Sequence, residues 1–286
     1  MTGSAADADD VVQETFARAL TFRPRKLDRP WLQRVALNLS LDLLRRRKRR
    51  AYVGPWLPQP VDTSDEPPAF EPEAGSERST EGRYELVESL SYAFLLALEV
   101  LTPKQRAVLL LRDVFDYSVE QTARALDTTP ASVKTLHHRA RRAMQGYDEK
   151  RCRPTVEARR RARGALERLV SALARRDLRQ VEALLSEDVV SLSDGGKHVP
   201  AARRPVTGRE RVARLWTGLA ARQLPSRVEI RILNGMPAAV LRGTNPDPIV
   251  LRVEVGGDGK VREIHSILAP EKVATLAPTR KRWWDA

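Results

Sequence analysis

The sequence is poor in cysteine and in long apolar runs, and each absence excludes a class of protein. Its 286 residues include one cysteine, so the chain forms no internal disulfide and offers no cysteine spacing typical of a metal site. The longest apolar window, Tyr92–Leu101, is far below the roughly 20 residues that cross a bilayer, and no signal peptide is visible. We therefore expect a soluble cytoplasmic protein that needs no metal, no cofactor and no membrane.

Basic residues are what the chain has in excess. Its formal net charge is +13 and its isoelectric point is near 10.4. The cations gather in two dense runs, at 45–50 and 159–163. Clustered positive charge favours a polyanionic partner. The alternative for each run is a solvated helix face, and neither run has the aromatic and aliphatic residues of a membrane-surface helix.

A helix-turn-helix is predicted in residues 118–144. Apolar residues recur at helical spacing in 118–126, and after a short turn Thr129 followed by Pro130 is a good helix start. The second helix, 130–144, has an apolar stripe on one side and cations and hydroxyls on the other, which suits the major groove of DNA. Its outward residues are expected to be Ser132, Lys134, Thr135, His138, Arg139, Arg141 and Arg142. The pattern predicts a DNA-binding regulator.

Two breaks divide the chain. Residues 58–80 alternate prolines with acidic residues, a composition typical of an extended linker, and the second break falls near 147–155. The predicted parts are two helical domains at 1–52 and 85–150, a linker at 53–84, a third domain at 155–275 and a tail at 276–286.

The third domain has a different pattern from the first two. Helices are expected at 156–174, 178–185 and 208–219, and short alternating strands at 189–192, 228–233, 238–242, 249–255 and 261–268. The predicted fold class is multidomain: two all-α domains followed by an α+β domain.

The N-terminal part pairs an acidic helix with a basic one. Residues 7–20 begin with carboxylates, which favour a helix start, and place Val11, Val12, Phe16 and Leu20 on an apolar face. Residues 31–50 turn an apolar face toward a core and project Arg34, Asn38, Asp42, Arg45 and Arg46 outward. A basic loop precedes Trp31, and such a loop suits capture of unstacked bases, although an aromatic residue there is more often a core anchor.

Short motifs recur in a fixed order along the whole chain. They begin with DADDVVQETF at 7–16, PWL at 30–32 and NLSLDLLRR at 38–46, and LTPKQRAV at 101–108 leads into the helix-turn-helix. In this order they resemble regions 2 and 4 of the extracytoplasmic-function sigma factors. YVGPWLPQP at 52–60, with turns at 194–197, 234–237 and 270–272, resembles the subgroup that carries a C-terminal SnoaL-like extension, a cone-shaped domain whose curved sheet encloses a pocket.

The resemblance implies a role for each part. The acidic helix is expected to dock on the clamp helices of the RNA polymerase core through Asp7, Asp10, Val11, Gln13, Glu14 and Phe16. The −10 element of promoter DNA is expected to be read by Arg23, Trp31, Asn38, Asp42, Arg45 and Arg46. The −35 element is expected to be read by Ser132, Lys134, Thr135, His138, Arg139 and Arg142. The extension is expected to contact the linker, through Trp56, Leu57 and Pro58 on one side and Asp194, Gly195, Gly196 and Lys197 on the other.

Two departures from the family pattern stand out. Region 2 of the family has a further helix of roughly 20 residues before the point that aligns with Met1 (an ordinary helix runs 8–20 residues), so we expect either a start codon placed too far downstream or a truncated copy. Gln59 stands where the subgroup has an acidic residue, which removes one charge from the linker.

Other functions stay open on sequence alone. Asp194, His198 and His265 are acid–base candidates of the third domain, but no pattern places them in a cavity, so we expect no enzyme. A helix-turn-helix regulator that senses a ligand and acts without polymerase core is the main alternative, and an inactive copy is another. A small molecule in the third domain is a further candidate partner, and it would bias the protein only through its differential affinity for two states.

Overall fold

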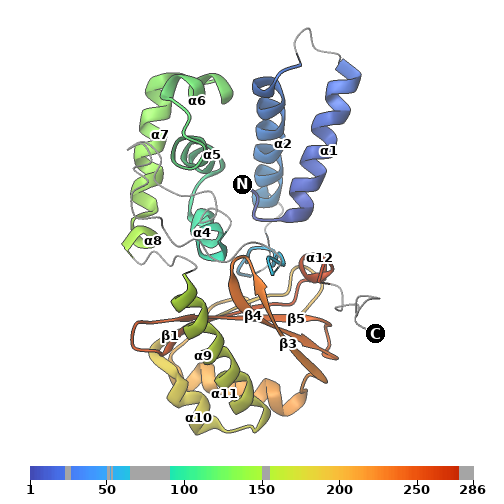
Figure 1. The fold of residues 1–286 in the computed structure, drawn as a ribbon, viewed down its shortest axis with the longest axis vertical. Helices are drawn as coiled ribbons and strands as arrows, with labels where there is room; N and C mark the ends of the chain where they lie inside the picture. Colours follow the sequence, from blue (N-terminus) through green and yellow to red (C-terminus); the bar gives the residue numbers. More distant parts are fainter. Residues whose placement is uncertain (23–26, 50–51, 53, 65–90, 150–154, 277–286) are drawn as a thin grey trace. The chain divides into compact units, whose positions relative to one another are not determined.

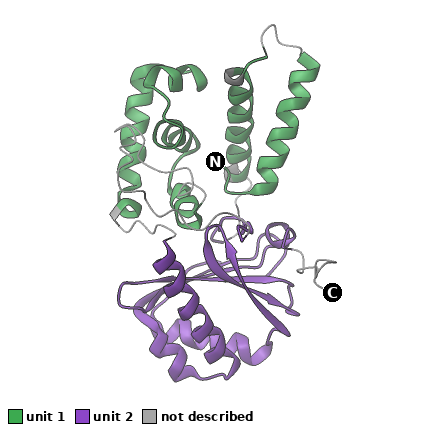
Figure 2. Ribbon diagram, viewed as in Figure 1, with its two compact units in different colours: residues 1–51, 70–153 green, residues 52–69, 154–286 purple. Residues whose placement is uncertain are grey.

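The structure is a computed structural model that describes residues 1–286 except 23–26, 50–51, 53, 65–90, 150–154 and 277–286, with backbone alone for 29–30, 48–49 and 149. The chain divides into two compact units (Figure 2). One comprises residues 1–51 and 70–153, and the other comprises residues 52–69 and 154–286. The first part of the predicted linker therefore belongs to the C-terminal unit.

Two long helices, α1 (Ala5–Phe22) and α2 (Arg29–Arg49), lie side by side in the first unit (Figure 1). The buried stripe of α1 is Val11, Thr15 and Ala19, spaced four residues apart. Val12, Phe16 and Leu20, which the sequence places on the same apolar face as Val11, are exposed. Val12, Phe16 and Leu20 thus form an exposed apolar stripe, and only Val11 departs from the predicted face, because it belongs to the neighbouring buried stripe.

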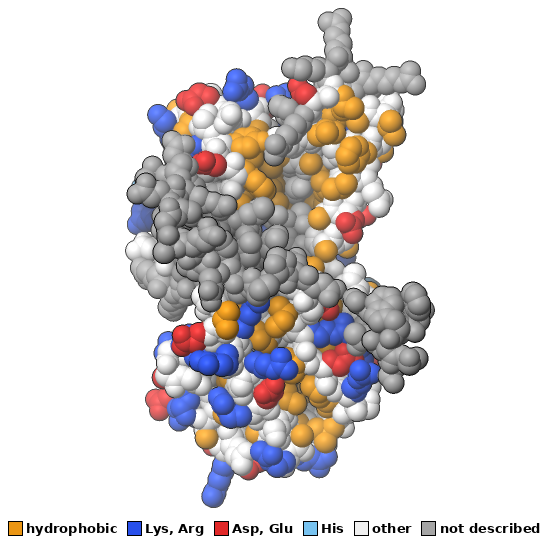
Figure 3. Space-filling view, in the orientation of Figure 1, with side chains coloured by type: hydrophobic (Ala, Val, Ile, Leu, Met, Phe, Trp, Pro, Cys, Tyr) orange, Lys and Arg blue, Asp and Glu red, His pale blue; other side chains and the backbone are white. Residues whose placement is uncertain are grey.

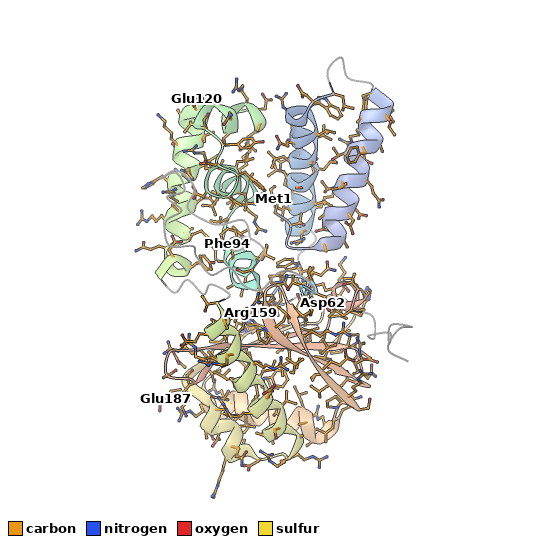
Figure 4. All side chains as sticks on the ribbon, viewed as in Figure 1. Met1, Asp62, Phe94, Glu120, Arg159 and Glu187 are labelled. Carbon is orange, nitrogen blue, oxygen red and sulfur yellow. The ribbon has the colours of Figure 1, made fainter. Side chains whose placement is uncertain are left out.

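The rest of the described part of this unit is a group of short helices. They are α4 (Tyr92–Ala97), the 3₁₀ turn η1 (Leu98–Val100), α5 (Pro103–Asp113), α6 (Val119–Ala125), α7 (Pro130–Ala143) and α8 (Gln145–Glu149). Capping boxes start α5 at Thr102 and α6 at Ser118. The core includes Leu98 and Leu109 with Met144, and Phe94 packs edge-on against Tyr147 (Figure 4). The predicted helix-turn-helix is therefore confirmed as α6 and α7.

The second unit is an α+β domain. Its helices are α9 (Val156–Ala174), α10 (Leu178–Leu184), α11 (Arg209–Arg222) and α12 (Pro270–Val273). Its strands are β1 (Leu185–Asp194), β2 (Val206–Thr207), β3 (Arg227–Leu233), β4 (Met236–Arg242), β5 (Ile249–Val255) and β6 (Val261–Ile267). They form one sheet in the order β2-β1-β6-β5-β4-β3, in which only β1 and β6 run parallel. The predicted fold class is confirmed.

The sheet has two different faces. The helices α9, α10 and α11 cover one face (Figure 1), where Leu166, Trp216 and Leu251 share one apolar core. Successive residues of a strand point to opposite faces. Ser191 of β1 points to the helix side, because its hydroxyl accepts the indole N–H of Trp216 in α11 at 3.1 Å. The segment that begins at Tyr52 lies on the opposite face of the sheet.

The strands that the sequence predicts are confirmed, although several elements differ from the prediction in their bounds. The strand β1 begins at Leu185, four residues before the alternating pattern starts, and α11 continues to Arg222. The two-residue strand β2 was not predicted because it is too short for a periodic signal. In the described part of the chain, no helix has the length and apolar character needed to cross a membrane.

Candidate functional sites

The outward side of α7 carries the side chains that the sequence assigns to duplex DNA. Lys134, Thr135, His138, Arg139 and Arg142 are exposed, and Ser132 is half-buried. The Thr129 hydroxyl accepts the backbone N–H of Ser132 at 3.2 Å and fixes the start of the helix. Val133 and Ala140 are buried on the opposite side. The helix thus presents a cationic, hydroxyl-bearing face of the kind that enters a major groove.

Behind α7 lies a buried ion cluster. The Asp113 carboxylate at the end of α5 is fully buried and lies 2.7 Å from His137 Nε2, and it accepts hydrogen bonds from Arg141 Nη2 at 2.9 Å and Nε at 3.1 Å. Burial alone would raise the pKa of Asp113, but the hydrogen bonds and positive charge of His137 and Arg141 hold it below its usual value. Arg141 therefore faces Asp113, which corrects its expected place on the DNA side, whereas His138 faces outward.

The surface of α2 carries the polar residues that the sequence assigns to opened DNA. Arg34, Asn38, Asp42, Arg45 and Arg46 are exposed, as predicted. Asp42 pairs with Arg45 at 2.9 Å. Trp31 is half-buried, and its backbone N–H donates to Asp28 at 3.0 Å. Arg23 lies outside the described residues.

The acidic helix α1 has a free surface of mixed character. Asp10, Gln13, Glu14 and Phe16 are exposed. Asp7, by contrast, pairs with Arg47 of α2 at 2.8 Å, and Val11 is buried. Figure 3 shows hydrophobic side chains gathered along α1, and Val12, Phe16 and Leu20 are among the exposed apolar residues of the described chain. Val11 therefore supports the helix pair and is not available to a partner.

On the face of the sheet opposite the helices, Asp194 holds the segment that follows Tyr52. The buried Asp194 carboxylate accepts the backbone N–H of Leu57 at 2.7 Å and the hydroxyl of Tyr52. Lys272 donates to Asp194 at 2.6 Å and to the Leu57 carbonyl at 2.5 Å, and its ammonium lies 4.1 Å from the ring centroid of Trp56. A buried carboxylate and ammonium are tolerated because each is paired and hydrogen-bonded. We call these five residues the linker clamp.

A second contact continues along the end of β3, where Asp62 lies (Figure 4). The backbone N–H of Asn234 donates to the Val61 carbonyl at 2.8 Å, and its side-chain oxygen accepts the Val61 N–H at 3.2 Å. Asp62 pairs with Arg231 at 3.4 Å. The linker is thus held along the edge of the sheet by main-chain and side-chain hydrogen bonds and by the Asp62–Arg231 ion pair.

The linker clamp brings together part of the set that the sequence predicts. Leu57 meets Asp194 directly, Trp56 packs on Lys272, and Pro58 is buried. Lys197 is exposed and makes no hydrogen bond or ion pair to another described residue; the cation of the clamp is Lys272.

Gly195 and Gly196 shape the turn after β1. A Cβ atom on Gly195 would lie 2.1 Å from the Val199 carbonyl oxygen, and one on Gly196 would lie 2.6 Å from Glu271 Oε1. Gly196 also has a φ of +63°, in the left-handed region that favours glycine. The two glycines therefore act by close approach of the backbone, and the contact with the linker is made by the Asp194 side chain.

Sequence reasoning singled out the motifs that contain Lys272, Asn234 and Tyr52 but assigned no contact to these three residues. The signal was present, because these residues lie in PEK at 270–272, NGMP at 234–237 and YVGPWLPQP at 52–60. Which member of each motif reaches the linker depends on strand register and chain turns, which a single sequence does not reveal.

A cavity of about 860 Å³ lies between the sheet and the helices of the C-terminal unit. Of the three acid–base candidates, His198 lines it, whereas Asp194 and His265 do not. Asp194 is engaged in the linker clamp, and His265 is buried with Nε2 at 2.9 Å from Glu263. The structure therefore does not bring the three together. Among the described residues, no group of three or more side chains could hold a metal ion.

The fold defines a class of protein: two helical modules with exposed cationic faces, joined to an α+β domain that holds their linker. Comparison with known proteins gives the family. Residues 1–50 match the model of sigma-70 region 2, and residues 91–144 match that of sigma-70 region 4. The chain is 32% identical, over 99% of its length, to the ECF RNA polymerase sigma factor SigJ of Mycobacterium tuberculosis, of which it covers 90%. It belongs to the extracytoplasmic-function (ECF) sigma factors of RNA polymerase.

Two further comparisons agree. The chain is 31% identical over 84% of its length to the ECF RNA polymerase sigma factor SigG of Mycobacterium tuberculosis, and it covers 68% of that protein. The crystal structure of Mycobacterium tuberculosis SigJ superposes with a TM-score of 0.69 at 30% identity, covering 97% of this chain and 93% of that one. The similarity therefore includes the C-terminal α+β unit, and a regulator that acts without polymerase is not favoured.

Proposed function

We propose that this sigma factor brings the RNA polymerase core to promoters through its two DNA-reading modules and works in the cytoplasm. The observation that carries the proposal is α7, which lies in the segment matched to sigma-70 region 4 and exposes Lys134, Arg139 and Arg142 over a packed helix-turn-helix. In this proposal α7 reads the duplex −35 element, and the exposed side of α2, with Asn38 and Arg46, reads the opened −10 element.

The polymerase contact is assigned to the free surface of α1. Its exposed carboxylates, Asp10 and Glu14, provide charge for a basic partner, and Phe16 with Val12 provides apolar area in the same stretch of helix. Interfaces combine an aromatic anchor with a polar rim in this way. The clamp helices of the polymerase core are the partner that we propose for this surface.

The C-terminal unit is assigned a regulatory role without catalysis. By holding Tyr52 and residues 54–63, it shortens the free tether between regions 2 and 4. Two modules on one tether gain affinity only when both engage their sites at once, so the free tether length sets promoter binding. A small molecule in the cavity of this unit would shift the hold on the linker through its differential affinity for the held and released states.

The test is promoter-dependent run-off transcription with purified core polymerase and a template from upstream of the gene. We expect transcripts only when the protein is added, and we expect their loss with Arg139→Ala combined with Arg142→Ala. The matched control is Arg160→Ala, since Arg160 is an exposed arginine of α9 in the other unit. Failure of the wild-type chain both to bind core and to direct transcription would refute the proposal.

A further inference from the structure

The cavity of the C-terminal unit is open, apolar and lined by both layers of the domain. Leu173 of α9, Trp216 and Leu219 of α11, and Leu241 and Leu251 of the sheet form its walls. Three residues that line it, Leu219, Leu224 and Val228, are exposed by 44%, 40% and 38%. Its volume of about 860 Å³ lies in the range of small-molecule sites. Exposed apolar residues on the lining of an apolar cavity provide area that a ligand would remove from water.

The charge of the lining narrows the class of ligand. Among the described residues that line the cavity there is no Asp or Glu, and the one permanently charged side chain is that of Arg222. Arg222 is exposed and forms no ion pair with another described residue. An arginine at the edge of an apolar cavity complements a single carboxylate or similar anionic group.

The cavity and the linker clamp meet in consecutive residues of β1. Ser193 lines the cavity and accepts a hydrogen bond from the Ser266 hydroxyl at 2.8 Å, whereas Asp194, the next residue, faces the linker. Leu268 also lines the cavity, and its backbone N–H donates to the Asp194 carbonyl at 2.7 Å. A shift of Ser193 or Leu268 therefore moves the backbone that carries the Asp194 carboxylate.

A second connection runs through the segment 198–202. This segment lines the large cavity, and with Gly195 and Gly196 it also lines a smaller cavity of about 240 Å³ that includes Gly54 of the linker. A Cβ atom on Gly54 would lie 3.8 Å from the carbonyl oxygen of Ala202, the last residue of the segment, so the linker passes close to the backbone of the segment. One short stretch of chain thus separates a ligand in the large cavity from the linker.

We propose that the large cavity binds an apolar molecule with one anionic group, such as a medium-chain carboxylate, and that its binding strengthens the hold of the C-terminal unit on Tyr52 and residues 54–63. A molecule that fills the cavity supports the segment 198–202 and the end of β1 from within, so these elements lose the freedom to relax away from the linker. The inference deepens the proposed regulatory role of this domain and rests on it. The ligand acts by favouring the clamped state over the released one.

Binding is tested on the full chain by calorimetry with sodium decanoate, and with decanol and decylamine as neutral and cationic probes. Decanoate should bind about fivefold more tightly than decanol, because it gains one exposed charge pair with Arg222. Decylamine should bind most weakly of the three. Arg222→Glu should abolish that preference, while Arg211→Glu on the same helix, exposed and not lining the cavity, should keep it. Ala174→Trp, at an exposed lining position, should block decanoate, and Ala221→Trp, exposed outside the lining, should not.

Coupling is tested by hydrogen exchange of the same chain with and without decanoate. We expect slower exchange of the Leu57 and Asn234 amides when decanoate is bound, and no such change in Asp194→Asn, which should still bind it. If decanoate does not bind, or binds no more tightly than decanol and decylamine, the proposed ligand site is overturned. If decanoate binds but the Leu57 and Asn234 amides do not exchange more slowly, the proposed coupling to the linker is overturned. If decanoate binds and slows exchange while the chain fails to direct transcription, it is the sigma activity that fails and the site that stands.

Discussion

The carboxylate of Asp194 accepts the backbone N–H of Leu57 at 2.7 Å, across 137 residues of sequence. A side chain that bonds to main chain does not depend on the identity of the linker side chain at that point. The linker clamp thus fixes the path of the linker at Leu57. Lys272 adds a second bond at the same residue, because its ammonium donates to the Leu57 carbonyl. The path of the linker determines how much chain is left to join the two DNA-reading modules.

Replacing Asp194 by Asn should loosen the linker and destabilise the C-terminal unit by about 3 kcal/mol, because the buried Lys272 ammonium then lacks its counter-charge. Urea unfolding measures the loss of stability, and exchange of the Leu57 amide measures the loosening. Glu187→Gln is the control, since Glu187 lies on the same strand with its side chain 90% exposed. Equal stability of Asp194→Asn and wild type would contradict the assigned charge pair.

The double variant Asp194→Asn with Lys272→Met should be more stable than the sum of the two single losses predicts. Each single change leaves one buried charge unpaired, whereas the double change removes both. The measurement is a double-mutant cycle of unfolding free energies, with an expected coupling of about 1–3 kcal/mol. Strict additivity would mean that the two groups do not interact.

The buried Asp113 should make region 4 sensitive to acid. The pKa of Asp113 is lowered in the folded chain, so the unfolded state binds the proton more tightly. The stabilisation that the ionised Asp113 gives the folded chain is therefore complete above the ordinary carboxyl pKa near 4. It is lost as the pH falls through the lowered pKa. Asp113→Asn should cost about 3 kcal/mol at neutral pH and flatten the loss of stability below about pH 4. Native-state hydrogen exchange of α5 and α7 measures both, with exposed Asp127→Asn as the control. An unchanged acid profile would exclude this role for Asp113.

Loss of a single exposed cation on α7 should weaken −35 binding in one of two ways. If Arg139 contacts a phosphate, Arg139→Ala should reduce the slope of log affinity against log salt by about 0.9 on every sequence. If it reads a base edge, the loss should be about 1–3 kcal/mol at one base pair only. Titration of duplex DNA at several salt concentrations separates these outcomes. An unaltered affinity on all sequences would remove Arg139 from the interface.

The turn after β1 should reject the smallest side chain. Gly195→Ala puts a methyl group 2.1 Å from the Val199 carbonyl oxygen and should cost about 2 kcal/mol, as overpacking does. Gly218→Ala is the matched test, because Gly218 lies in α11 with no neighbour within 4 Å of its added Cβ. It should raise stability by about 0.5–1 kcal/mol through helix propensity. Equal effects of the two substitutions would refute the steric argument.

The sequence predicts most of the fold, since helices such as α9 and strands such as β5 follow directly from apolar periodicity. It groups Val11 with the exposed Val12 and Phe16, although Val11 is buried, because a periodic pattern shows which residues are apolar but not which of two adjacent stripes a neighbouring helix covers. It likewise cannot choose Lys272 over Lys197 as the cation of the clamp, because Lys272 is 215 residues from Leu57 in the sequence and meets it only in the folded domain. A helix or strand can be predicted from the residues within it, whereas the residues that it contacts depend on segments far away in the sequence.

The most direct test of the account is run-off transcription by reconstituted polymerase with wild-type protein, Asp194→Asn and Glu187→Gln, each at matched core occupancy. The account predicts promoter-specific transcripts with wild type and Glu187→Gln. With Asp194→Asn it predicts a transcript yield that differs from wild type by at least fivefold. This factor corresponds to a change of about 1 kcal/mol in the free energy of promoter binding when the linker is no longer held. The same yield from all three would contradict control through the linker clamp, and no transcript from any of them would contradict the sigma activity itself.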